Sequence, residues 1–101
     1  MNDNEIKVAV DKYIERSIKN ILNATFTNNK GNKRFEIVNV FKVNNLFYCA
    51  AKEILENESL SDTIELRGLF LSPERSTIRF IIGEKEFEDV KAEYQRLYGN
   101  D

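Results

Sequence analysis

Residues 44–58, NNLFYCAAKEILENE, decide the fold of this chain. Their apolar side chains form three adjacent pairs, each four residues from the next: Leu46 and Phe47, Ala50 and Ala51, Ile54 and Leu55. Wound as a helix, these pairs cover one half of the surface and leave polar residues on the other half. Because Ala-Ala-Lys-Glu forms strands poorly, the stretch is interpreted as a helix with an asparagine cap.

A strand is the alternative for the same residues. Asn44 and Asn45 would then form a tight hairpin turn, since asparagine tolerates positive φ. The two interpretations predict different folds, because only the first places a helix between the strands of the chain.

The other elements follow from apolar periodicity and turn residues. A capping-box spacing of Asn2 and Glu5 opens the first helix, and Pro73 suits the turn of the last hairpin. In chain order the sequence predicts a helix, two strands, the middle helix, two strands and a final helix, at residues 2–22, 25–27, 34–43, 45–56, 63–71, 77–82 and 84–98.

These elements predict one α+β domain spanning residues 1–101, since the chain has no room for a second core. The order α-β-β-α-β-β-α is most simply a two-layer fold, in which three helices pack on an antiparallel four-stranded sheet. If the middle stretch is a strand, the prediction becomes α-β5-α, a five-stranded meander between two helices.

The sequence contains few residues that could carry out catalysis or bind a metal ion. The chain contains no histidine, and its single Cys49 has no histidine to deprotonate it. Its four glycines are isolated, so no phosphate-binding loop is present, and no carboxylates follow a calcium-loop spacing. We therefore expect no enzyme activity, no cofactor and no metal.

The composition favours a cytoplasmic protein. The polar N-terminus does not resemble a signal peptide, no apolar run is long enough to cross a bilayer, and a lone cysteine fits a reducing compartment. Abundant asparagine, lysine and isoleucine suggest an AT-rich bacterial or phage genome. If a phage encodes the protein, we expect it in the cytoplasm of the host.

One turn offers a candidate contact to nucleic acid. It carries three cations, Lys30, Lys33 and Arg34, which could contact backbone phosphates. The loop has no aromatic residue on which a base could stack, and the net charge of the chain is −2. Weak nucleic-acid binding is therefore the alternative function, and membrane binding has less support still.

The leading prediction is a protein-binding module that acts by occupying the surface of a partner, as a phage or mobile-element inhibitor or immunity protein does. If Leu71 pairs with Thr77 and all helices cover one face of the sheet, an apolar strip remains on the other face. The strip and its flanking cations would bind a protein partner or a second copy in a homodimer, through Val38, Val40, Leu69, Ile81, Arg67 and Arg79. The competing expectation is that one helix crosses over and buries the strip.

Overall fold

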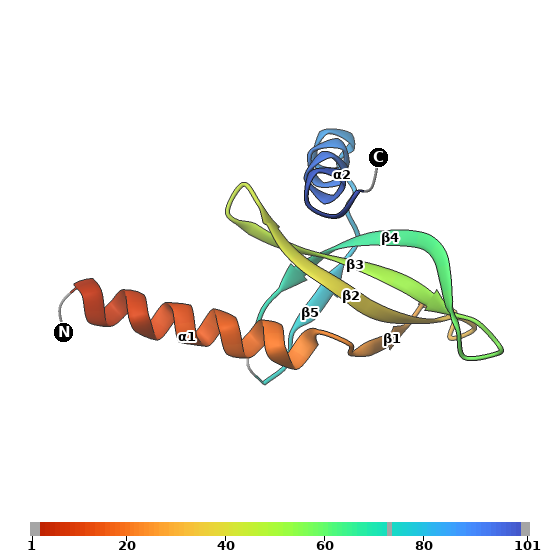
Figure 1. Ribbon diagram of the computed structural model, residues 1–101, viewed down its shortest axis with the longest axis horizontal. Helices are drawn as coiled ribbons and strands as arrows, with labels where there is room; N and C mark the ends of the chain where they lie inside the picture. The colour runs from red at the N-terminus through yellow and green to blue at the C-terminus, as the bar shows by residue number, and fades with distance from the viewer. Residues whose placement is uncertain (1–2, 73, 100–101) are drawn as a thin grey trace.

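The computed structural model describes residues 3–72 and 74–99, with side chains from Lys12 onward. The predicted cap at Asn2 and the predicted turn residue Pro73 lie outside the described residues. Within the described residues, one helix precedes five strands in the chain and a second helix follows them (Figure 1). The elements in chain order are α1 (Asp3–Ile21), β1 (Thr25–Thr27), β2 (Arg34–Val43), β3 (Leu46–Ile54), β4 (Leu60–Phe70), β5 (Thr77–Arg79) and α2 (Glu84–Tyr98).

The strands form one curled antiparallel sheet in the order β1-β2-β3-β4-β5, so each strand pairs with its neighbours in sequence. Helix α2 lies on one face of this sheet, whereas α1 leads into β1 and its first turns extend beyond the sheet (Figure 1). The predicted four-stranded sheet with three helices is therefore wrong, and the α-β5-α alternative is correct.

The error lies in the middle stretch, which forms the central strand β3. Asn44 and Asn45 have φ of 50° and 67°, so both occupy the left-handed region that a two-residue hairpin turn requires. Val43 then pairs directly with Leu46. Ala50 and Ala51 are both 0% exposed because this strand is covered on both faces, and such strands show continuous apolar runs instead of alternation.

A β-bulge in β2 changes which residues share a face of the sheet. Ile37 pairs with Ala51 and Asn39 pairs with Ala50, which leaves Val38 as the extra residue. From this point the alternation of β2 is reversed. Phe41 consequently packs with Val38 on the α2 side, although strict alternation from residue 34 puts them on opposite faces.

The last hairpin is shifted by one residue from its predicted register. Thr77 pairs with Phe70, and Ile78 pairs with Leu69. The prediction paired Thr77 with Leu71, and a slip of one residue turns every side chain of β5 to the opposite face relative to β4. Leu69 and Ile78 therefore share a face.

Two hydrophobic clusters result, one on each face of the sheet. The α2-side cluster contains Phe41, Tyr48, Ala50 and Val90, with Val38 and Ile81 packed against it. The opposite cluster is built around three buried side chains and receives Ile21 from the last turn of α1, and its buried members are Ile37, Cys49 and Leu69. The buried Ser17 hydroxyl donates to the Tyr13 carbonyl oxygen at 2.8 Å, so this part of α1 has no unsatisfied hydroxyl.

Candidate binding site between the edge strands

A hollow of about 370 Å³ lies between the two edge strands, β1 and β5. Because the sheet curls, residues from the first and last strands border the same space although they are about 50 positions apart in the chain. We call this space the edge hollow, and its lining residues are Phe26, Thr27, Asn28, Asn29, Lys33, Phe35, Arg67, Ile78, Arg79 and Phe80.

Aromatic side chains form much of the apolar wall of the edge hollow. The Phe26 and Phe35 rings stack with centroids 5.2 Å apart and an interplanar angle of 17°. Phe80 is 57% exposed, and the Arg67 guanidinium carbon lies 4.8 Å from its ring centroid. A partner side chain entering the hollow would therefore meet flat apolar surfaces with a cation beside them.

The charge around the edge hollow is positive. Lys33 and Arg67 line it, and none of its lining residues, all of which are described, is acidic. Arg67 is partly neutralised because its guanidinium lies 3.3 Å from a Glu65 carboxylate oxygen. Lys33 is exposed, so it offers a cation at the rim of the hollow.

The loop that carries Lys33 is held by the side chain of Asn28. The Asn28 amide oxygen accepts hydrogen bonds from the backbone N–H groups of Asn32, at 3.1 Å, and Lys33, at 3.2 Å. Gly31 has φ of 72°, a conformation that glycine adopts without steric cost. The loop therefore has a defined shape that keeps Lys33 beside the hollow.

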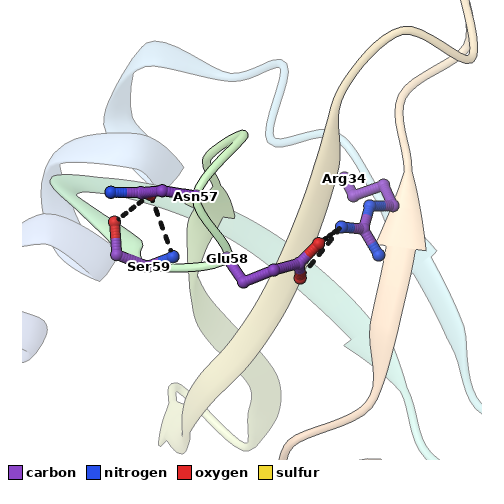
Figure 2. A network of polar contacts seen from close by, with 4 residues as sticks. All are labelled: Arg34, Asn57, Glu58 and Ser59. Atoms are coloured by element: carbon purple, nitrogen blue, oxygen red, sulfur yellow. Dashed lines mark hydrogen bonds and ion pairs between the residues drawn. The ribbon is translucent and has the colours of Figure 1, made fainter.

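The three cations predicted to contact nucleic acid do not act as one group. Arg34 donates to both carboxylate oxygens of Glu58, at 3.0 and 3.2 Å (Figure 2). In the same picture, the Asn57 side-chain oxygen accepts from the Ser59 backbone N–H and hydroxyl, which shapes the turn that presents Glu58. Lys30 is exposed outside the hollow lining, so only Lys33 of the predicted three borders the hollow.

The predicted apolar strip is divided between the two faces of the sheet. Val38 and Ile81 pack in the cluster under α2, whereas Val40 and Leu69 pack in the opposite cluster. The expectation that these four residues share one exposed face is wrong, because the bulge at Val38 and the shifted hairpin reverse the alternation on which it depended. Partner binding by these residues individually stays a prediction.

The two arginines of the predicted site have separate surroundings. Arg67 lines the edge hollow over Phe80. Arg79 also borders the hollow, but its guanidinium lies 2.6 Å from a Glu86 carboxylate oxygen on α2. Of the predicted set, therefore, the arginines are the members that border the hollow.

A polar cluster of Tyr48, Arg79 and Glu86 joins α2 to the sheet. The Tyr48 hydroxyl donates to Glu86 at 2.5 Å, and the Arg79 guanidinium lies over the Tyr48 ring, 5.5 Å from its centroid. Hydrogen bonds from Arg79 and then Tyr48 hold the pKa of Glu86 below its usual value. Burial, reinforced by the Glu86 carboxylate, raises the pKa of Tyr48. The hydrogen bonds and the ion pair of this cluster hold the start of α2 and the side chain of Arg79 against the sheet.

The chain has one thiol, that of Cys49, and it lies in the cluster opposite α2. Cys49 is fully buried, and burial raises the pKa of its thiol to about 12, so the thiolate form is disfavoured near neutral pH. Within residues 3–72 and 74–99, no group of acidic, cysteine or histidine side chains is arranged to hold a metal ion. Neither described helix is long and apolar enough to cross a membrane.

Sequence reasoning missed the edge hollow because its walls come from opposite ends of the sheet. Phe26 lies in a strand of three residues, and Phe80 lies near the end of the segment 77–82, which the sequence predicts as an ordinary strand of the last hairpin. The signal that could have found it was the five-stranded alternative, in which a curled meander brings its first and last strands towards each other. A comparison with protein-family models, curated proteins and solved structures found no match.

Proposed function

We propose that this chain is a protein-binding module and that the edge hollow is its binding surface. The observation that carries this proposal is an apolar hollow between two short edge strands, with an aromatic side chain, Phe80, left 57% exposed at its wall. Exposed strand edges present unpaired backbone groups, and an extended segment of a partner can pair with them while its side chains enter pockets.

The lining favours a partner segment that combines apolar and acidic side chains. Phe26, Phe35 and Ile78 supply apolar contact area, and Lys33 and Arg67 supply positive charge. Complementary charge steers association and fixes the register of a bound segment more than it adds affinity. Such a module would act by occupying a partner's surface, in the manner of an inhibitor or immunity-type protein, and its lone buried thiol suits the cytoplasm.

The test is selection of peptides from a random display library on the wild-type protein, followed by titration of the enriched peptides into three proteins. Phe80→Glu places a carboxylate in the wall of the hollow and should abolish binding of peptides that contact this site. Leu60→Glu is the matched control, because Leu60 is an exposed apolar residue that does not line the hollow. Enriched peptides that bind all three proteins equally, or no enrichment at all, would contradict the proposal.

Single-stranded nucleic acid is the second candidate ligand, because the structure places stacked aromatic rings beside Lys33. The sequence shows no aromatic residue on the loop that carries Lys33, but Phe26 and Phe35 of the flanking strands border the same hollow. Fluorescence anisotropy with a labelled oligothymidylate at two salt concentrations tests it. Two or three phosphate contacts predict a salt slope of about −2 or shallower, and binding should weaken in Lys33→Ala. Affinity unchanged by salt or by Lys33→Ala would exclude this site.

A further inference from the structure

Both outer strands of the sheet border the edge hollow with an unpaired side. Strand β1 pairs only with β2 and strand β5 only with β4, and among the described residues no backbone hydrogen bond from another element reaches the second side of either strand. Thr27 of β1 and Ile78 of β5 both line the hollow. The hollow therefore lies between two strand edges, and unpaired edges of this kind accept a further strand.

The sense of the strands determines which way a further strand must run. Each pairing in the sheet is antiparallel, so β1, β3 and β5 run in one sense and β2 and β4 run in the other. A direct pairing of β1 with β5 would be parallel, whereas one inserted strand can be antiparallel to both. Such a strand would close the curled sheet of Figure 1 and leave neither edge unpaired.

Two cations of the hollow lie at the end where β1 and β5 terminate. Thr27 is the last residue of β1, and Lys33 directly precedes the β2 residue that pairs with it. The Arg67 guanidinium lies over the ring of Phe80, the residue that follows β5. Positive charge is therefore concentrated at the carboxyl ends of the two edge strands.

The apolar wall lies further back along the same strands. Phe26 is the middle residue of β1 and stacks on Phe35, and Ile78 is the middle residue of β5. A segment antiparallel to both strands enters with its amino-terminal end beside the cations and continues along these apolar side chains. Complementarity therefore requires acidic residues first and apolar residues at alternate positions after them, since alternate side chains of a strand share a face.

We propose that the occupant of the edge hollow is an extended segment of a partner protein in which acidic residues precede alternating apolar residues, and that it pairs antiparallel with β1 and β5 at once. The inference rests on the proposed function, because it names the class of segment that the same hollow binds and the direction in which it lies. The leading carboxylates contact Lys33 and Arg67. This chain's own edge segment, residues 77–82, contains no acidic residue and does not meet this requirement.

The test is titration of two labelled peptides, Glu-Asp-Glu-Val-Thr-Ile-Thr-Val and its reversed sequence, with the full chain by fluorescence anisotropy. The peptides have the same composition, so only the order of acidic and apolar residues differs. We expect the acidic-first peptide to bind about tenfold more tightly than the reversed peptide. Lys33→Glu should weaken the acidic-first peptide about tenfold, whereas Lys30→Glu, the same change on the same loop outside the hollow lining, should weaken it less than about twofold.

Amide hydrogen exchange in the presence of the acidic-first peptide tests where this peptide lies. Exchange should slow in β1 and β5 together, since the inserted strand pairs with both edges. Slower exchange at one edge only, equal binding of the two peptides, no binding of either, or an acidic-first affinity unchanged in Lys33→Glu would overturn the inference. Library-selected peptides that lack the acidic-first order and lose binding in Phe80→Glu would leave the proposed function standing.

Discussion

Replacing Glu86 by glutamine tests whether the polar cluster holds α2 on the sheet. Glutamine keeps the shape of the side chain but removes the charge that Arg79 faces at 2.6 Å and weakens the acceptor for the Tyr48 hydroxyl. Hydrogen bonds to charged groups contribute about 1.5–3 kcal/mol each in favourable settings. The Glu86 side chain is 29% exposed, so water lowers this value, and we expect Glu86→Gln to cost about 1–2 kcal/mol of unfolding free energy.

The pH dependence of this loss distinguishes the ion pair from simple packing. The folded state holds the pKa of Glu86 below its usual value, chiefly through the Arg79 hydrogen bond. The carboxylate therefore stabilises the fold fully above the unfolded pKa, near 4.3, and its contribution disappears as the pH falls through the lower folded value. The difference between wild type and Glu86→Gln should thus be largest near neutral pH and should shrink in acid.

Urea denaturation followed by circular dichroism measures the difference at both pH values. A loss of about 1–2 kcal/mol corresponds to a fall in melting temperature of roughly 5–15 °C for a domain of this size. Glu88→Gln, at an exposed position on the same helix, is the matched control and should change stability little. An equal loss at neutral and acid pH, or no loss in Glu86→Gln, would refute the reasoning.

Three further predictions concern the sheet. Gly68→Ala should destabilise the fold by about 1–3 kcal/mol, because its Cβ would lie 2.6–2.8 Å from Arg79 side-chain atoms; denaturation of the double variant with Glu86→Gln should show less than additive losses. Asn45→Val should cost about 1–2 kcal/mol because a β-branched residue is strained at φ of 67°, whereas Asn45→Gly should be tolerated in the same melting assay. Cys49 should react with a thiol reagent only as fast as the protein opens, since the folded thiol has a pKa of about 12, and rapid labelling of the native protein would contradict its burial.

The parts of the fold that sequence could predict are those governed by local periodicity. Both terminal helices were predicted to within a residue or two, and the bounds of β2 were predicted correctly. The middle strand was not, because its paired apolar residues imitate a helical stripe. Burial on both faces, which produced that pattern, is a property of the assembled sheet and leaves no separate signal in a stretch of nine residues.

The predicted apolar strip and the edge hollow both depend on two features that the sequence does not display. One is the bulge at Val38, which reverses the faces of β2 with no glycine or proline to mark it. The other is the register of the last hairpin, where one residue decides whether Leu69 lies beside Ile78. Each shift moves a whole set of side chains to the opposite face of the sheet. Either shift alone is therefore enough to divide the predicted apolar strip between the two faces.

The two shifts also explain why the edge hollow exists. The reversed alternation after Val38 lets the α2-side cluster take Phe41, while Phe35, ahead of the bulge, stays on the opposite face and lines the hollow beside Phe26. The hairpin register places Ile78 on that same face. Because Ile37 and Asn39 already pair with the adjacent residues Ala51 and Ala50, deleting Val38 should remove the bulge and keep both halves of β2 on their present faces. Inserting one further residue at this point should instead turn one half of β2 to the opposite face and lose the hollow.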